Sequence, residues 1–308
     1  MITILMATFN GEAFIRKQLD SILQQNVQEW NLIIQDDCST DQTVVIAREY
    51  EVLYPDKIKV IIREEPSGSA KSNFYSMLSL FDSDYMMTCD QDDIWLPHKI
   101  EATLSKMKEV EARVGVNTPV LVHTDLKVVD QNEKILSNSI FKRQRLSATK
   151  CSLNHLLVQN IVTGCSMMVN RALIQKVSPV PSHSIMHDWW FALIASAFGQ
   201  IGFVDEPTLL YRQHGYNEVG SKDAGSLAYT FRRLFEGAEI KDSISKTFQQ
   251  AEEFQSRFGS ELSVQALETL TAYITLREQN KLLRLKTICT FGFWKTGVFR
   301  KCGQLLHM

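Results

Sequence analysis

The sequence predicts an α/β protein with a mostly parallel central sheet, helices on both faces of that sheet, and a C-terminal helical extension. Short apolar runs alternate with amphipathic helical patterns through residues 1–115, which is typical of parallel strands joined by helices. From about residue 221 the chain changes to long helical patterns rich in Leu, Glu, Gln, Lys and Arg. With 308 residues, the chain is long enough for one large domain and such an extension.

The elements of the first half follow from apolar runs and the residues that interrupt them. The β-rich run at 2–8 ends at the Asn10-Gly11 turn. The second strand ends in an acidic segment, where Thr40 or Asp41 caps the next helix. The expected order is a strand at 2–8, a helix at 13–25, a strand at 30–35, a helix ending at 54, a strand at 58–63, a helix at 69–81 and a strand at 85–89.

Residues 116–220 are more mixed. We expect a strand at 120–129 that carries Asp125 and a strand at 162–169 that carries Gly164. A short helix at 188–198 and a strand at 209–213 follow.

Composition excludes several classes of protein. The net charge is −2 and no zinc-finger or arginine-rich pattern occurs, so nucleic acid is not an expected partner. The six cysteines include no C-x-x-C pair, which indicates reduced thiols in a reducing compartment. The N-terminus lacks a basic segment before its apolar run, and no run approaches about 20 apolar residues. We therefore expect a cytoplasmic protein, at most peripherally attached to a membrane.

Polar segments follow each predicted strand of the first half. Ligands of parallel α/β sheets bind beyond the carboxyl ends of the strands, so these segments should lie along one edge of the sheet. They are Thr8-Phe9-Asn10, Asp36-Asp37, Arg63 and Asp90-Gln91-Asp92-Asp93.

The last of these segments is the strongest candidate for a metal site. Mg²⁺ and Mn²⁺ prefer oxygen ligands and often share them with substrate phosphates. Residues two apart in an extended segment, such as Asp90 and Asp92, face the same side. The alternative is an acidic loop that caps the next helix, a role that Asp93 alone would satisfy. Three carboxylates after a buried strand, beside the other polar segments, favour the metal site.

In combination these motifs resemble the inverting family-2 glycosyltransferases of the GT-A fold, and within them most closely the bacterial rhamnosyltransferases of surface-polysaccharide synthesis. The likeness covers residues 1–220. Cys38 stands where that family usually has Gly. The motifs that carry the resemblance are Ala7-Thr8-Phe9-Asn10-Gly11, Asp36-Asp37-Cys38-Ser39-Thr40-Asp41, Cys89-Asp90-Gln91-Asp92-Asp93-Ile94-Trp95, Thr163-Gly164-Cys165, His187-Asp188-Trp189-Trp190 and Tyr211-Arg212-Gln213-His214-Gly215.

This resemblance implies a Rossmann-like catalytic domain at 1–220, with a nucleotide-binding half at 1–115 and an acceptor half at 116–220, followed by the helical extension at 221–308. It implies metal-dependent transfer of a sugar, with rhamnose from dTDP-rhamnose as the first choice, to a growing, lipid-linked bacterial polysaccharide. A UDP-hexose donor on the same fold and a non-catalytic carbohydrate-binding protein remain alternatives. A nucleotidyltransferase would need a Gly-rich loop near its N-terminus, which this chain lacks. An aspartate-nucleophile phosphatase would need a D-x-D motif directly after the first strand, where this chain has Thr8-Phe9-Asn10.

The nucleotide-sugar donor is expected at the first strand ends. Thr8, Asn10 and Glu12 would meet the nucleotide, although an Asn-Gly turn with a helix cap is the better explanation of this segment taken alone. In similar enzymes an acidic pair contacts the base; Asp37 is the preferred residue, and Asp36 is either its partner or a helix cap. Arg63 and Lys71 would face phosphate charge, or else are ordinary surface cations, and Asp90 would share the ribose or the metal.

Asp188 is the expected general base, because inverting transfer needs one group to deprotonate the acceptor hydroxyl and similar enzymes place an acid at this helix start. Its alternative is a simple helix cap. Trp189 and Trp190 would stack on a sugar, although a buried aromatic pair explains at least one of them.

Asp90, Asp92 and His214 are the expected ligands of Mg²⁺ or Mn²⁺, with Asp92 the best and Asp93 the most dispensable. His214 would come from a mobile loop marked by Gly215 and Gly220. Arg212 would contact the diphosphate. The remaining expected acceptor-side residues are Trp95, Asp125 and Gly164, and Asp125 has an alternative role as a turn anchor.

The C-terminal segment 277–308 has seven basic residues and one acidic residue, a net charge of +6, interleaved with aromatic residues. Such a segment fits peripheral contact with an anionic membrane, which would place the enzyme at the inner face of the cell membrane. Packing on the catalytic domain or on a second subunit, as in a homodimer, explains it equally well.

Overall fold

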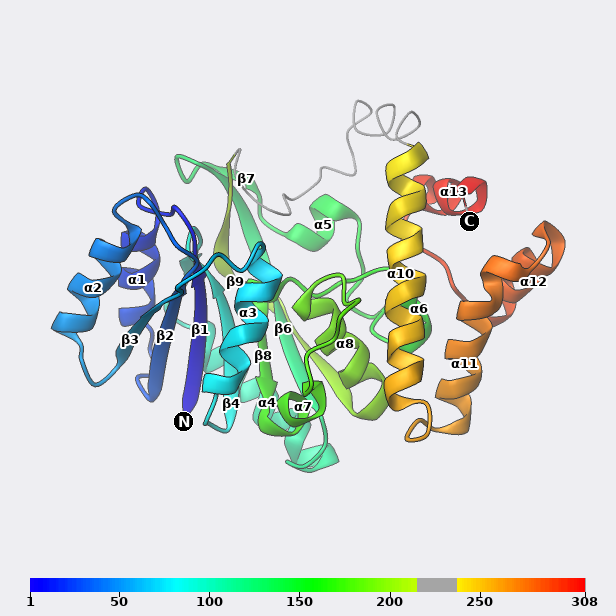
Figure 1. Cartoon of the computed structure of the whole chain (residues 1–308), viewed down its shortest axis with the longest axis horizontal. Helices are drawn as coiled ribbons and strands as arrows, with labels where there is room; N and C mark the ends of the chain where they lie inside the picture. Colours follow the sequence, from blue (N-terminus) through cyan, green and yellow to red (C-terminus); the bar gives the residue numbers. More distant parts are fainter. Residues whose placement is uncertain (215–236, 308) are drawn as a thin grey trace. The chain divides into compact units, whose positions relative to one another are not determined.

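The computed structural model of the chain describes residues 1–214 and 237–307 (Figure 1). Contacts group these residues into two compact units. The first comprises Met1–Ile140, Val162–Lys176 and the strand that begins at Gln200, and the second comprises Phe141–Ile161, Val177–Gly199 and the C-terminal helices. Each unit thus combines segments that are distant in sequence, whereas a division at residue 220 remains a prediction.

The first unit is built on one nine-stranded sheet in the order β3-β2-β1-β4-β8-β6-β9-β5, with β7 paired to β6. Strands β1 to β4 are mutually parallel, whereas β8 runs antiparallel to both β4 and β6. The predicted α/β class is confirmed. The strands are β1 Ile2–Thr8, β2 Trp30–Asp36, β3 Ile58–Ile62, β4 Tyr85–Asp90, β5 Ile94–Trp95, β6 Val120–Asp130, β7 Ile135–Ser137, β8 Met167–Asn170 and β9 Gln200–Gln213.

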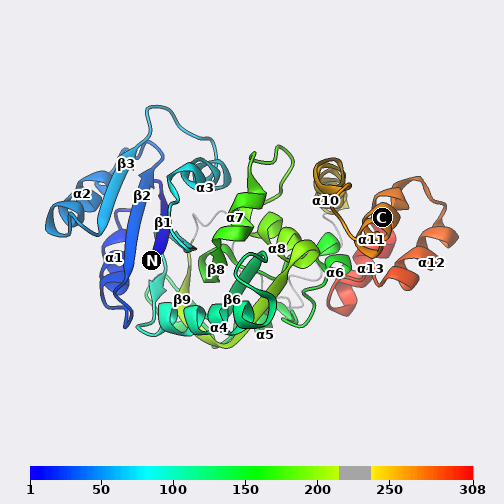
Figure 2. The same ribbon diagram turned by 90° about the horizontal axis from the view of Figure 1, so that it is seen from below.

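Helices cover both faces of the strands β1 to β3. Figure 2 shows α1 and α2 on one side of these strands and α3 on the other. This arrangement explains why consecutive residues of β1, such as Ile4, Leu5 and Met6, are all fully buried. The helices of this unit are α1 Ile15–Leu23, α2 Thr43–Leu53, α3 Ala70–Met77 with the short 3₁₀ helix η1 Leu78–Leu80 after it, and α4 Lys99–Val114, which packs on β6, β8 and β9.

Two strands differ from the sequence prediction. Gly164 lies in the 3₁₀ turn η2 (Gly164–Ser166) and not in a strand, because the Ser166 N–H and hydroxyl both donate to the Thr163 carbonyl, at 2.9 and 2.7 Å. Strand β8 begins only after this turn. Strand β9 begins at Gln200 and not at residue 209, and its parallel pairing with β6 shifts register near Asp125. The polar residues Asp205 and Glu206 interrupt the apolar pattern of β9 and concealed its length.

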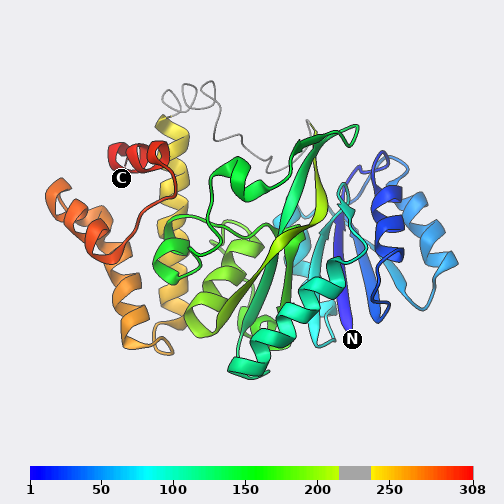
Figure 3. The same cartoon turned by 180° about the vertical axis from the view of Figure 1, so that it is seen from behind.

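The second unit is helical (Figure 3). Its long helix α10 packs beside α11, and α13 contacts α10 as well. Trp190 of α8 is fully buried against Phe254 and Phe258 of α10. In the described ranges, no helix has both the length and the apolar character that a membrane span requires. The helices of this unit are α5 Ile140–Gln144, α6 Leu153–Val158, α8 His187–Phe198, α10 Gly237–Phe258, α11 Val264–Ile274, η3 Thr275–Glu278, α12 Lys281–Phe291 and α13 Val298–His307. Helix α7, Arg171–Val177, belongs to the first unit as far as Lys176.

Candidate active site

The predicted convergence of strand ends is confirmed. In the parallel register, Thr8 of β1 lies opposite Asp36 of β2, and Ala7 lies opposite Asp90 of β4. Asp36 in turn lies opposite Ile62, the last residue of β3. The polar segments that follow these strands therefore share one edge of the sheet.

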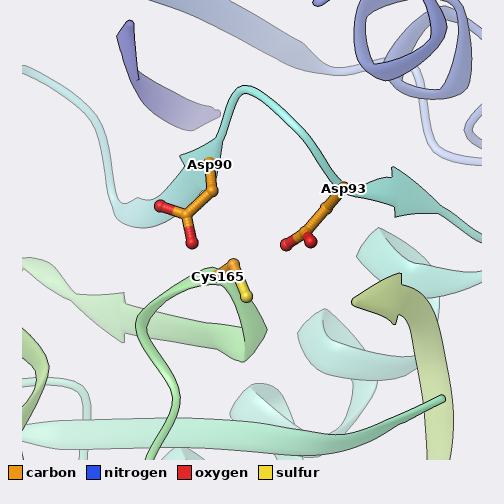
Figure 4. Close-up of side chains that lie close together, drawn as sticks. All are labelled: Asp90, Asp93 and Cys165. Carbon is orange, nitrogen blue, oxygen red and sulfur yellow. The ribbon is translucent and has the colours of Figure 1, made fainter. Parts of the chain in front are cut away.

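Two of the carboxylates after β4 meet a cysteine from another part of the chain. Asp90 ends β4, Asp93 precedes β5, and Cys165 lies in the η2 turn. One ligand atom from each of the three lies within 4.8 Å of the others, and Figure 4 shows the two carboxylates directed toward the space beside the thiol. The antiparallel pairing of β8 with β4 brings Cys165 to this position.

Asp93 is the buried member of this cluster, with 1% of its surface exposed. Its Oδ1 accepts the backbone N–H of Arg212 at 3.2 Å, while Oδ2 has no hydrogen-bond partner among the described residues. Burial, and then the charges of Asp92 and Asp90, raise the pKa of Asp93 well above its usual range. Burial likewise raises the pKa of the Cys165 thiol. Helix α4 begins at Lys99 after His98, so Asp93 does not cap it.

Lys99 is a second buried ionisable side chain beside this cluster, and no motif in the sequence pointed to it. Its side chain is fully buried, its ammonium lies 4.8 Å from the centre of the Trp95 ring, and no residue in the described ranges accepts a hydrogen bond from it. Burial lowers the pKa of Lys99 to about 8, while the acidic groups of Cys165, Cys89 and Asp93 act in the opposite direction. Among sequence signals, only its short distance from the carboxylates would have pointed to it.

Asp92 meets His214 across the β5–β9 pair. The Asp92 Oδ2 and His214 Nε2 atoms lie 2.7 Å apart. The imidazole also stacks on Phe14, with ring centres 4.6 Å apart and an interplanar angle of 18°. The structure thus brings two of the three predicted metal ligands together and groups the third, Asp90, with Asp93. The predicted loop at Gly215 and Gly220 lies outside the described residues.

The Arg212 side chain is buried and forms hydrogen bonds within the protein. It is 2% exposed, and its Nε donates to the Asp92 carbonyl at 2.8 Å. Nη1 donates to the Gln131 carbonyl at 3.0 Å, and Glu133 Oε1 lies 3.5 Å from both terminal nitrogens. These contacts connect the carboxylate loop, Asp90-Gln91-Asp92-Asp93, to the turn between β6 and β7. The position of the Arg212 side chain therefore does not support the predicted direct contact with a diphosphate.

The two acidic residues at the end of β2, Asp36 and Asp37, have different contacts. Asp36 is fully buried, and its carboxylate accepts hydrogen bonds from the Thr8 hydroxyl at 2.8 Å and from the Ser39 N–H at 2.8 Å. It therefore anchors the two strand ends. Asp37 accepts from the Ser67 N–H at 2.6 Å and lies 3.3 Å from Arg63 Nε.

Asn10 and Glu12 bind the segment that leads into α2. The Asn10 Oδ1 accepts the Thr40 N–H at 2.8 Å, and the Glu12 Oε2 accepts the Gln42 N–H at 2.8 Å. Asn10 has a positive φ of 45°, which suits an asparagine in a turn. These two side-chain oxygens therefore shape the loop in this structure. Lys71 lies in the first turn of α3, half-buried.

Gln91 also belongs to this edge, although the sequence analysis gave it no role. Its side-chain amide pairs with Phe9 in both directions, at 2.9 Å from the Phe9 N–H and 2.8 Å to the Phe9 carbonyl. A Cβ at Gly11 would lie 2.2 Å from the Gln91 side-chain amide, so a larger residue at position 11 would displace that amide from Phe9. Gln91 thereby ties the end of β1 to the carboxylate loop.

The acceptor-side residues of the first unit are mostly structural. Trp95 is 2% exposed and covered by Lys99. The Asp125 Oδ1 accepts the backbone N–H groups of Leu126 and Ile140, at 2.8 and 3.0 Å, which is the turn-anchor alternative. Gly164 is buried, and its carbonyl accepts the Thr88 hydroxyl at 2.7 Å.

Asp188 lies in the first turn of α8, in the second unit. Its Oδ1 accepts the Trp189 N–H at 2.6 Å, and 8% of the residue is exposed. Trp189 is half-buried and donates through Nε1 to the Leu156 carbonyl at 2.6 Å. Trp190 is fully buried against α10, so it is a core residue, and the sugar-stacking role predicted for it is not supported.

Comparison with known proteins points in one direction. The sequence profile of the family described as "Glycosyl transferase family 2" matches residues 3–178. The "dTDP-rhamnosyl transferase RfbG" of Shigella flexneri is 29% identical over 249 residues, which cover 78% of this chain and 82% of that protein.

Two solved structures share the fold at low sequence identity. S. aureus TarS 1–349, in complex with UDP-GlcNAc, superposes with a TM-score of 0.54 at 17% identity, over 90% of this chain and 82% of that one. The mannosyltransferase PcManGT from Pyrobaculum calidifontis, in complex with GDP-Man and Mn²⁺, gives a TM-score of 0.54 at 15% identity, over 99% and 83%. These likenesses confirm the GT-A fold.

Proposed function

The chain belongs to glycosyl transferase family 2 and is a glycosyltransferase, and we propose that it is a metal-dependent, inverting enzyme that moves rhamnose from dTDP-rhamnose onto a growing, lipid-linked bacterial polysaccharide. The observation that carries metal dependence is the carboxylate segment Asp90-Gln91-Asp92-Asp93 after β4, where the Asp92 carboxylate lies 2.7 Å from the His214 imidazole and Asp90 adjoins Asp93. The donor sugar rests on the likeness to a dTDP-rhamnosyl transferase.

The side chains of this loop fit Mg²⁺ or Mn²⁺. Three carboxylates supply the oxygen ligands that such ions prefer, and His214 adds one imidazole nitrogen. The Cys165 thiol stays protonated because burial raises its pKa. Cys165 is therefore not proposed as a ligand. We assign the metal to Asp90, Asp92 and His214, with Asp93 beside them. A bound ion would neutralise the charge of the departing diphosphate.

The nucleotide would lie over the ends of β1 and β2. Asp37 is the residue proposed to accept the imide N–H of a pyrimidine, because Ser67 and Arg63 hold its carboxylate in one orientation. Asp36 would act indirectly by fixing Thr8. The phosphate charge would be met by Arg63 and Lys71.

Asp188 is proposed as the general base. The hydrogen bond from the Trp189 N–H to one carboxylate oxygen fixes its direction, and the N-terminal end of a helix favours a charged carboxylate. The charged form is the one that accepts the proton of an acceptor hydroxyl. Trp189 would contact the acceptor sugar with the part of its ring that remains exposed.

The acceptor is proposed to be lipid-linked, so the enzyme would work at the cytoplasmic face of the cell membrane. The net charge of +6 in residues 277–308 supports contact with an anionic membrane surface. A homodimer through the same helices is the second candidate for this surface.

A donor panel tests this function. Nucleotide release would be followed with dTDP-, UDP- and GDP-sugars, each with Mn²⁺, Mg²⁺ or EDTA, for the wild type and for Asp92→Ala. We expect turnover that needs metal, prefers dTDP-rhamnose and is lost in the variant. Preference for a UDP-hexose would replace the donor assignment alone. Absence of metal-dependent turnover and of donor binding for every sugar would favour a non-catalytic carbohydrate-binding protein.

A further inference from the structure

The C-terminal helices enclose a pocket that the proposed transfer reaction does not use. Its volume is about 200 Å³, and it lies wholly within the second unit, between α10, η3, α12 and α13. The lining residues are Lys241, Ile244, Ser245, Phe248, Leu276, Arg277, Arg284 and His307.

The polar lining carries basic groups and no carboxylate. Arg277 forms an ion pair with Glu252, and its guanidinium lies 5.4 Å from the centre of the Phe248 ring. Arg284 donates to the carbonyls of Leu276 and Gln279, at 2.9 and 2.8 Å. Both guanidinium groups are thus held in place before any ligand binds, which lowers the entropic cost of binding an anion.

The pocket is also lined by apolar side chains. Ile244, Phe248 and Leu276 line it and are each at most 5% exposed. A compact anion joined to an apolar chain would match both the basic and the apolar side chains of the lining, whereas a free sugar carries no charge to match the basic ones.

The two helices that contribute Arg284 and His307 also carry exposed leucines. Leu282 of α12 is 82% exposed and Leu306 of α13 is 72% exposed. Large apolar side chains at such exposure, within a segment of net charge +6, fit insertion among lipid headgroups.

We infer that this pocket binds the phosphate group of an anionic lipid, with the leucines of α12 and α13 inserted beside the headgroup. The inference deepens the membrane contact of the proposed function and is independent of the sugar that is transferred. Phosphate is the expected anion because its negative charge matches a lining that combines two guanidinium groups with the ammonium of Lys241.

Vesicle binding by the full chain tests this site. Flotation would compare vesicles of phosphatidylcholine alone with vesicles that also contain phosphatidate. The informative variant is Lys241→Glu, at the exposed rim of the pocket, and the matched control is Lys286→Glu, an exposed residue of α12 that does not line it. Both variants change the net charge equally.

We expect phosphatidate-dependent binding that is at least about fivefold weaker in Lys241→Glu than in Lys286→Glu. Equal losses in the two variants would overturn the pocket in favour of diffuse attraction between charges. Stabilisation of the wild type by inorganic phosphate or pyrophosphate, without any preference for phosphatidate vesicles, would overturn the lipid as the source of the phosphate. Metal-dependent nucleotide release measured without vesicles should be unchanged in both variants, so a failure of the proposed function would be seen separately.

Discussion

The Asp92 carboxylate and the His214 imidazole lie 2.7 Å apart, although 122 residues separate them in the sequence. The antiparallel pairing of β5 with β9, in which Ile94 lies opposite Leu210, creates this proximity. The ring of Phe14, the residue before α1, stacks on the imidazole of His214. The contact thus joins three segments of the first unit at the edge of the sheet where the metal is proposed.

We expect Asp92→Ala and His214→Ala each to weaken activation by Mn²⁺ about 10- to 100-fold. The double variant should lose little more than the worse single variant, because both side chains serve one ion. Nucleotide release over a Mn²⁺ titration measures this. His183→Ala, which removes an exposed histidine, is the control. If the losses of Mn²⁺ activation in the double variant are fully additive, Asp92 and His214 do not bind the same ion.

Asp188→Asn should reduce kcat for sugar transfer by about 10²- to 10⁴-fold, the usual contribution of a general base. Donor affinity in the presence of metal should remain close to that of the wild type, because the amide keeps the shape of the carboxylate. Calorimetric titration with donor and Mn²⁺ would accompany the rate assay. Asp205→Asn, at an exposed acid, controls for loss of charge, and wild-type transfer rates in Asp188→Asn would remove the assignment.

Arg212→Met should lower the free energy of unfolding by about 3–5 kcal/mol, because it leaves buried acceptors without their partner. Urea denaturation measures the difference. Arg171→Met removes an ion pair with Asp82 whose side chains are 45% and 95% exposed, so its cost should stay below about 1 kcal/mol. A small decrease in the free energy of unfolding of Arg212→Met, together with a raised KM for the donor, would instead indicate that Arg212 contacts the diphosphate.

Trp190→Ala should lower the free energy of unfolding by about 3–5 kcal/mol, because it opens a cavity between α8 and α10. Trp189→Ala should cost less, because that side chain is only half-buried, and should raise the KM for the acceptor. Thermal unfolding and acceptor titrations of the two variants distinguish these effects. A Trp190 variant of normal stability that fails to bind acceptor would restore the stacking role.

His123 should make stability depend on pH. Burial lowers the pKa of His123 from 6.5 to about 3, so between these values the unfolded chain binds a proton that the folded chain does not. The contribution of this histidine to the free energy of unfolding is fully retained above pH 6.5. It falls by about 1.4 kcal/mol for each unit that the pH decreases below 6.5. Compared with His123→Leu, the wild type should therefore lose stability more steeply between pH 6.5 and 5.

The denaturation midpoints of both proteins, measured at several pH values, give this slope. His183→Leu removes an exposed histidine and serves as the matched control. Parallel pH profiles for the wild type and His123→Leu would contradict the buried, neutral state of His123.

The first four strands were predictable because each is a local apolar run that ends at a turn or a charged residue. The predicted start of β1 at Ile2 and of β2 at Trp30 agrees with the structure. The η2 turn was not predictable in the same way, because Gly164-Cys165-Ser166 interrupts an otherwise apolar stretch without a charged or proline signal. The polar side chain that closes this turn, Ser166, bonds to a carbonyl three residues earlier.

The candidate site was predictable in its residues and less so in its grouping. Carboxylates at strand ends are visible in the sequence, and so is the order of the motifs. The position of Cys165 beside Asp90 depends on antiparallel pairing of β8 with β4, which no local pattern encodes. Asp93 was the carboxylate least expected to bind the metal, and the structure shows that it is the buried member of the three, with its pKa raised by burial.

The packing of Trp190 against Phe254 and Phe258 has a practical consequence. A gene shortened after the β-sheet would retain α8, with the proposed base, yet remove the aromatic residues that cover its apolar side. The truncated polypeptide would display that side to solvent and self-associate. Residues 237–307 are thus required for a stable enzyme that does not aggregate. Limited proteolysis should leave α8 and α10 bound to each other even after cleavage of the chain between them.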